Sequence, residues 1–368
     1  MACLNKIKYF LLVCTLVVLT GACSKSFLEP EPLSFFTPEN VFVDKQGYQA
    51  LLITMRKDLA REQTGQKNFL AHQWAASEAG VPWLQMDFTR LTPNSDTYQQ
   101  FVSQIKDIFE MVRNANTIIS RIDDIEWASE TDRNQILAEA FWHRSYWYYR
   151  LIGNYGDLPF IKEEVRGVRV DFKTHSRWAI LDQIQSDLEF AVQWMPVSAA
   201  AGVPSKGAAN HLLTKVYLAN MEFEKAVSAA AAVINGPYAL MQERFGIDAA
   251  DPAKNVLWDL HRPENKNITQ NKETILAFVD RWEAPQAARS PGLFTMRVYH
   301  CAWYNNAVAK DKDGGLGMVD RGPLYDSLGR GNPDVALSDY HSYKIWEDGT
   351  YNSKNTPDLR RADINWWD

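Results

Sequence analysis

The stretch that most constrains the fold is residues 138–160, AEAFWHRSYWYYRLIGNYGDLPF. Apolar residues recur at helical spacing from residue 136 onward, which predicts a long amphipathic helix with an aromatic-rich apolar face. We expect Gly153 and Asn154 to end this helix, the next glycine and aspartate to form a turn, and Pro159 to prevent the helix from resuming. The rest of the chain must pack around this helix.

The flanking regions also carry helical patterns. We expect helices over residues 98–122, 178–194, 208–220 and 223–234, and another that starts at Thr37-Pro38 and runs through Leu59. A short strand is expected over residues 166–172. From about residue 235 the pattern changes to short apolar runs, separated by long connections rich in Gly, Asp and Asn. The expected fold class is therefore mainly α, with a loop-rich, short-strand C-terminal region.

Two of the expected helices show repeat spacing. Leu213, Tyr217 and Ala226 match the tetratricopeptide pattern, although Thr214 stands where glycine is usual and Pro237 falls one place early. Helix pairs of this kind stack into a shallow solenoid. The sequence therefore predicts tetratricopeptide-like helix pairs.

The N-terminus predicts export. Lys6 and Lys8 precede an apolar run over residues 9–19, which is followed by small residues and Cys23. The run is shorter than the about twenty apolar residues that span a bilayer. We therefore expect residues 1–22 to be a cleaved signal peptide, and residues 23–36 to be a tether.

A cysteine directly after Gly21-Ala22 matches a bacterial lipobox, although Thr20 holds the position usually taken by Leu. We expect lipidation at Cys23, and an ordinary cleaved signal peptide is the alternative. Loss of the leader would leave Cys301 as the one unmodified cysteine. It lies beside His300, but we expect a buried inert thiol rather than a Cys-His nucleophile.

Composition and motifs argue against several functions. The formal net charge of −6 argues against nucleic acid as a partner, since phosphate binding needs a basic face that this composition does not indicate. The chain has no Gly-x-Ser-x-Gly, His-Glu-x-x-His, P-loop or Cys-x-x-Cys motif. Its histidines are scattered as single residues, so we expect no metal site and no cofactor. No motif singles out a carboxylate pair, and Glu139 is expected on the helix surface or in a buried polar network. We expect no enzyme activity.

Several segments together resemble the SusD/RagB family of surface lipoproteins from Bacteroidetes-type bacteria. They are the Ala-Glu-Ala aromatic helix with Tyr155-Gly156-Asp157-Leu158-Pro159, the Thr37-Pro38-Glu39-Asn40 helix start, and the Asn-rich helix around residues 114–119. The resemblance implies a SusD-like α-α superhelix over residues 37–235, and a loop-rich region over residues 236–368 with a strand at 271–280.

This resemblance also implies a function. Members capture nutrients, usually glycans, for a SusC-like TonB-dependent transporter in the outer membrane. Family members generally continue beyond the point where this chain ends. The chain is therefore expected to be a fragment or a truncated product, with apolar faces of the repeat helices left uncovered, or else to close its core differently.

Ligand-contacting residues have no motif in this family. The chain holds 13 Trp, 15 Tyr and 17 Phe, and we expect most of these rings in the core. A sugar-binding surface needs exposed aromatic rings beside polar groups, and two loop regions offer them. By position, we expect the ligand to contact Trp83, Asn94, Tyr98, Trp303 and Tyr304.

The sequence thus predicts a lipid-anchored, surface-exposed outer-membrane protein that binds a glycan without cleaving it. An exported helical-repeat lipoprotein scaffold, or a peptide-capture protein, is the alternative. The ligand discriminates them, because a scaffold binds polypeptide and ignores oligosaccharides.

Overall fold

The computed structural model describes residues 37–63, 77–82, 92–278, 285, 310–315 and 335–366. The chain divides into two compact units, residues 1–47 and 48–368. In the first unit, helix α3 (Pro38–Val41) begins after Thr37, whose backbone N–H donates to Asn40 Oδ1 at 2.8 Å. The predicted helix start is confirmed, but the prediction of one helix through Leu59 is wrong. A second helix, α4 (Lys45–Asp58), begins where the Asp44 carboxylate accepts from Gly47 N at 3.0 Å.

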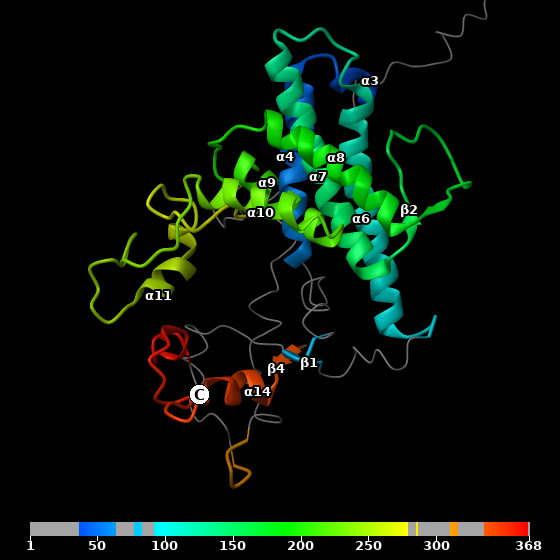
Figure 1. Cartoon of the computed structure of the whole chain (residues 1–368). Coiled ribbons are helices and arrows are strands. Elements are labelled where there is room, and N and C mark those ends of the chain that lie inside the picture. The colour runs from blue at the N-terminus through cyan, green and yellow to red at the C-terminus, as the bar shows by residue number, and fades with distance from the viewer. Residues whose placement is uncertain are drawn as a thin grey trace, which may run out of the picture. The chain divides into compact units, whose positions relative to one another are not determined.

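The second unit is built mainly from helices, and those between residues 96 and 234 pack on their neighbours in chain order (Figure 1). The helices of this unit up to residue 234 are α4, the 3₁₀ helix η1 (Leu59–Gln63), α6 (Asp96–Arg121), α7 (Glu130–Tyr155), α8 (Arg177–Trp194), α9 (Lys206–Ala219) and α10 (Phe223–Ile234). Helix α6 packs on α7, α7 on α8, α8 on α9, and α9 on α10. The predicted mainly helical class with consecutive helix pairs is confirmed.

Serine side chains start three of these helices. Ser129 Oγ accepts from Asp132 N at 3.1 Å, and Ser176 Oγ accepts from Ala179 N at 3.2 Å. Ser205 Oγ does the same for the third residue of α9. Such caps satisfy N–H groups that have no partner inside the helix, at about 0.5–2 kcal/mol each.

Helix α7 ends later than predicted. Gly153 and Asn154 remain helical, and the helix continues to Tyr155. Gly156 then adopts φ 71°, in the region that favours glycine, and its N–H donates to Ile152 O at 3.2 Å. Asp157 follows, and its carboxylate accepts from Arg177 N at 2.8 Å at the start of α8. The turn after α7 therefore also positions the next helix.

Strands are few and short in the described ranges. Antiparallel β2 (Leu158–Pro159) and β3 (Thr174–His175) flank the segment predicted to be a strand, and β1 (Gly80–Pro82) pairs antiparallel with β4 (Val335–Leu337). Residues 166–172 form no strand. The prediction is wrong there because these residues have no core to face, and Val168 is 100% exposed.

The remaining elements after α10 are short. They are α11 (Val256–His261), η3 (Pro263–Asn265), α14 (Asp339–Ser342), η5 (Lys344–Trp346) and η6 (Leu359–Arg361). The strand expected over residues 271–280 is absent from its described part, 271–278, where Asn271 Oδ1 instead accepts from Glu273 N and Thr274 N. The short elements and long connections confirm the loop-rich character of this region.

The core lies around α7. Large side chains of this helix, among them Trp142, Trp147, Tyr148 and Leu151, are buried with apolar residues of α6, α8 and α9. Tyr148 also uses its polar end, because its hydroxyl accepts from Ile161 N at 2.6 Å. For these rings the expectation of a core role is confirmed.

Three charged residues of α7 are paired with other elements. Glu139 accepts two hydrogen bonds from Arg56 of α4, at 2.6 and 2.7 Å. Arg144 lies 2.7 Å from Asp187 of α8, and Arg150 lies 2.6 Å from a carboxylate of η1. Glu139 thus belongs to a buried polar network, which was one of its two predicted roles.

Helix α10 is covered much less than α7. Of its residues, Ala226 and Ala229 are buried. Phe223, Val227 and Ile234 are 60%, 69% and 74% exposed. No helix in the described ranges is both long and apolar enough to cross a membrane.

Candidate functional site

The structure describes two of the five predicted ligand residues, Asn94 and the backbone of Tyr98. Trp83, Trp303 and Tyr304 lie outside the described residues, as does the predicted lipidation site Cys23. Asn94 is exposed in a turn before α6. The backbone of Tyr98 lies in α6, but its side chain is not among the described ones. These five ligand contacts stay predictions.

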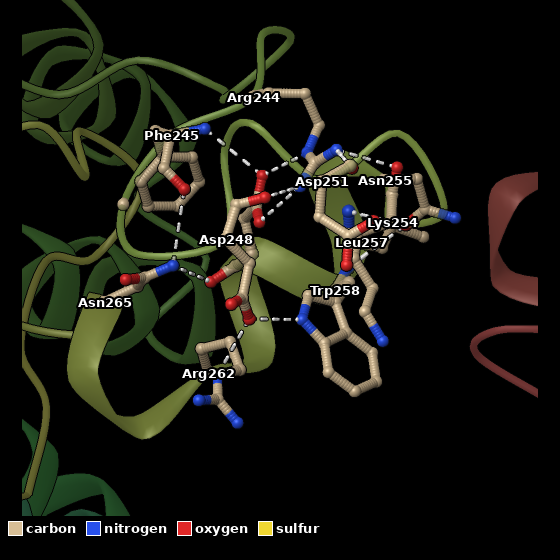
Figure 2. Close-up of polar contacts among 12 residues, drawn as sticks. Arg244, Phe245, Asp248, Asp251, Lys254, Asn255, Leu257, Trp258, Arg262 and Asn265 are labelled. Atoms are coloured by element: carbon tan, nitrogen blue, oxygen red, sulfur yellow. Dashed lines mark hydrogen bonds and ion pairs between the residues drawn. The ribbon is translucent and has the colours of Figure 1, made fainter.

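A different polar cluster is well defined between residues 244 and 265 (Figure 2). Its centre is Asp259, which is fully buried and 2.5 Å from Arg244 Nε. The same carboxylate accepts from Arg244 Nη2 at 3.1 Å and from Phe245 N at 3.1 Å. The hydrogen bond to Asp259 raises the pKa of Arg244. This arginine therefore stays charged and joins the two ends of the loop.

Arg244 also holds the loop backbone. Its Nη1 donates to Asp251 O at 2.6 Å and to Lys254 O at 2.8 Å, and its Nη2 donates to Asp248 O. A planar guanidinium can satisfy several carbonyl groups at once, because its donors point in fixed directions. The loop that precedes α11 is therefore rigid at the points where these carbonyls lie.

Three asparagines complete the frame. Asn255 Oδ1 accepts from Leu257 N and Trp258 N, both at 3.1 Å, and so caps α11. Asn365, far along the chain, donates to the same oxygen at 3.0 Å. Asn265 is buried, and its Nδ2 donates to the Asp259 backbone oxygen at 3.0 Å.

This frame presents one half-buried tryptophan with charged neighbours. Trp258 Nε1 donates to Asp248 Oδ2 at 2.8 Å, which fixes the ring. Lys254 Nζ lies 3.7 Å from the ring centroid, and the Arg262 guanidinium lies 5.9 Å from it. We call these four residues, Asp248, Lys254, Trp258 and Arg262, the Trp258 platform (Figure 2).

The platform has the chemistry of a binding surface. It combines a fixed aromatic ring with cationic donors and a carboxylate acceptor, which suits a ligand that has apolar faces and hydroxyl edges. Its carboxylate is already engaged, because Asp248 accepts from Trp258 and lies 3.2 Å from Arg262 Nε. Among the described residues, no group of three or more His, Cys, Asp or Glu side chains could hold a metal ion.

The sequence contains a local structural signal for this site, although it contains no functional motif there. Residues 255–260 resemble a short apolar run. Asn255, however, is a preferred N-cap residue, and it stands directly before helix-compatible residues that include Trp258 and Asp259. An N-cap at Asn255 predicts a short helix that carries Trp258.

The motif residues themselves have structural roles. Asn116 is buried in α6, where its Nδ2 donates to Ile161 O at 2.7 Å and its Oδ1 accepts from Arg144 at 3.2 Å. Arg121 of the same helix pairs with Glu164 at 2.8 Å. The segment after the turn is therefore held against α6 by side chains of the Asn-rich helix.

Two kinds of relatives support this fold. Curated relatives include a SusD-like protein P2 of Formosa agariphila, 27% identical over 62% of this chain and 46% of the relative. A SusD-like protein of Bacteroides ovatus is 23% identical over 94% of this chain and 63% of the relative. The chain therefore spans between about half and two thirds of the length of these relatives.

Solved structures agree at the level of the fold. A Bacteroides fragilis protein named NanU superposes with a TM-score of 0.63 and 16% identity, covering 87% of this chain and 63% of that one. A SusD-like carbohydrate-binding protein of the same species gives a TM-score of 0.60 and 15% identity, over 86% and 57% of the two chains.

A family model described as "Starch-binding associating with outer membrane" matches residues 27–218. The match covers just over half of the chain and extends from before α3 to within one residue of the end of α9. The chain therefore belongs to the SusD-like family.

Proposed function

We propose that this protein is a non-catalytic nutrient-binding lipoprotein of the cell surface, which captures a glycan for a SusC-like TonB-dependent outer-membrane transporter. The observation that carries the proposal is the family match, whose description names both starch binding and association with the outer membrane. It is supported by the superposition on a SusD-like carbohydrate-binding protein of Bacteroides fragilis.

The Trp258 platform is our candidate for part of the glycan surface. A sugar ring would displace Lys254 from the face of the indole and stack there, and Lys254 and Arg262 would then donate to its hydroxyl groups. Asp248 would hold the indole rather than react with the ligand, since its carboxylate is already occupied. The predicted contacts Trp83, Asn94, Tyr98, Trp303 and Tyr304 would supply further parts of this surface.

Calorimetric titration tests the proposal. Residues 24–368 would be titrated with starch-derived oligosaccharides, other neutral glycans and unrelated peptides, and the mixtures would be chromatographed for cleavage products. We expect saturable binding of at least one glycan and no products. Cleavage would contradict the non-catalytic role, and binding of peptides alone would contradict glycan capture.

Single substitutions locate the surface. Truncating an aromatic anchor costs more than about 1 kcal/mol, so Trp258→Ala should weaken glycan binding about fivefold or more. Tyr340→Ala is the control, because Tyr340 is 56% exposed on α14 and lies outside the platform. Equal weakening by both variants would contradict a specific role for the platform. Trp83→Ala and Trp303→Ala test the other predicted contacts in the same way.

Anchoring and partnership need separate measurements. Cys23→Ser should abolish metabolic labelling by palmitate and release the protein from the membrane fraction, if Cys23 carries the lipid. Cross-linking in cells should recover a TonB-dependent transporter with the parent chain. Labelling that persists in Cys23→Ser would contradict this anchor.

A scaffold is the second candidate, and one observation favours it. The exposed apolar residues Phe223, Val227 and Ile234 lie on α10, and stacked helix pairs can present surfaces to polypeptides. The peptide arm of the titration decides between the two functions. The scaffold would be supported if a peptide binds the parent chain but not Val227→Asp, and if no glycan binds.

A further inference from the structure

A pocket of about 260 Å³ lies among three helices of the family fold, and no residue of the Trp258 platform lines it. Its walls come from the last turns of α7, the first turns of α8 and the end of α9. The volume is below the about 300–1,000 Å³ of pockets for drug-sized ligands, so it suits a single sugar or amino-acid residue.

The pocket has an apolar part and an open side. Ile152 and Leu181 are buried, at 3% and 0% exposure, and the partly buried Ala219 adds a methyl group. Gly153 also lines the pocket, and a Cβ atom added there would meet no atom within 4 Å. Access is therefore not blocked by a side chain at this position of α7.

The pocket is lined by two arginines with different partners. Arg150 is neutralised by Glu62, at 2.6 Å. The backbone N–H of Arg177 donates to the Asp157 carboxylate at 2.8 Å, but its guanidinium forms no ion pair among the described residues, and its buried Nε has no hydrogen-bond acceptor there. Its guanidinium is 4.9 Å from the Trp178 ring centroid, and this contact orients the guanidinium plane without providing a hydrogen-bond acceptor.

A buried donor without an acceptor is unfavourable, and a guanidinium matches a carboxylate through two parallel hydrogen bonds. We propose that this pocket binds one residue of a carboxylate-bearing ligand, with Arg177 as the partner of the carboxylate. The ligand is either an acidic sugar or the free C-terminus of a peptide. Such a second site goes beyond capture of a neutral glycan at the Trp258 platform.

Calorimetry with matched ligand pairs tests the charge requirement. The chain over residues 24–368 would be titrated with glucuronic acid and glucose, and with an acetylated tripeptide carrying a free or an amidated C-terminus. We expect saturable binding of at least one acid, and binding of its neutral counterpart at least about tenfold weaker, as for loss of one charge-assisted pair. The acid that binds identifies the source of the carboxylate.

Two variants tie binding to the pocket. Arg177→Gln should weaken the acid about tenfold or more, whereas Arg169→Gln, an exposed arginine paired with Asp171, should leave it unchanged. Gly153→Leu should block the pocket while thermal unfolding and helical circular dichroism stay as in the parent chain. If Arg177→Gln does not fold, Gly153→Leu still decides the matter.

The outcomes separate this site from the proposed glycan site. Loss of acid binding in Gly153→Leu, with neutral oligosaccharide binding intact, supports a separate pocket. The proposal is overturned if folded parent chain binds neither acid, if acid and neutral ligands bind equally, or if neither pocket variant weakens the acid. Failure of oligosaccharide binding alone would count against the proposed glycan capture and not against this pocket.

Discussion

Helices α7 and α10 both belong to the consecutive helical array, yet they differ in which side chains they bury. Helix α7 buries charged Glu139 and Arg144 together with its aromatic rings, while α10 exposes Phe223, Val227 and Ile234. Helix α7 packs against both α6 and α8, and the helix that α10 packs against is α9. A residue's burial in this fold is therefore decided by the position of its helix in the array more than by its own hydrophobicity.

The largest expected effect is at the buried pair of α7. Burial raises the pKa of Asp187, and the charge and hydrogen bond of Arg144 oppose that shift. Removing one partner of such a pair costs about 3–5 kcal/mol, because the other charge stays buried alone. Arg144→Met should lower the free energy of unfolding by that amount in urea titration.

A double variant serves as the control for that pair. Arg144→Met with Asp187→Leu removes both charges, so it should be more stable than Arg144→Met alone. If the double variant loses as much as the two single variants together, the two residues are not coupled, and the account of α7 as a helix with paired charges is wrong.

The same substitution on two helices tests the comparison directly. Ile184 of α8 is fully buried against the α7 core, and Ile234 of α10 is 74% exposed. Ile184→Ala should cost about 2–5 kcal/mol through lost burial and a cavity, whereas Ile234→Ala should stay within about 0.5 kcal/mol. Chemical denaturation of both variants measures the contrast. Similar losses would mean that α10 is covered in the protein in solution.

The pH dependence of Glu139 should be smaller and has a defined sign. Burial alone would raise the pKa of Glu139, but the hydrogen bonds from Arg56 hold it below its ordinary value of 4.5. The folded pKa is then below the unfolded one, so the stabilisation is present above about pH 4.5 and is lost as the pH falls through the folded pKa.

Comparison with Glu139→Gln isolates this contribution. Parent and variant should differ by about 1.5–3 kcal/mol near neutral pH, and the difference should shrink below about pH 4.5. The pKa values of Asp58 and Asp187 are raised, so these two residues make the protein less stable as the pH rises. Both are present in the parent chain and in the variant, so their contributions cancel in the comparison. A difference that grows on acidification would contradict the assignment.

The smallest effect is expected at an exposed pair. Arg133 lies 2.6 Å from Asp123, whose side chain is 72% exposed. The hydrogen bond from Arg133 lowers the pKa of this aspartate, but solvent screens the pair. Asp123→Asn should cost about 0.2–1 kcal/mol at low salt, and less at about 1 M salt. A salt-independent loss would indicate that the pair is not screened as its exposure predicts.

Much of the helical part was predictable because its signals are local. Helical spacing located α6 to α10 within a few residues, since one face of each helix must be apolar to pack. The motif residues were also informative, and the structure explains why: Gly156 supplies the positive φ that ends α7, and Asp157 receives the first N–H of α8. They specify the fold, which is why they identified a family and no ligand.

The errors have local causes as well. Residues 166–172 have the alternating pattern of a strand, but a strand needs a partner and a face to bury, and Val168 and Val170 have neither among the described residues. Gly153 was expected to stop α7, but glycine in a helix costs only about 1 kcal/mol, and packing of the flanking aromatic turns overrides that cost.

The sequence by itself determined the helix order, the family and the structural role of its motif, because these depend on spacing over a few residues. Only the tertiary structure decided which polar side chains meet. Arg56 and Glu139 are 83 positions apart, and Asn255 and Asn365 are 110 apart. The pocket around Arg177 could not be predicted from the sequence, because three helices contribute its lining. The residues of the Trp258 platform are close in sequence, but only the structure shows that Arg244 and Asn365 hold their loop.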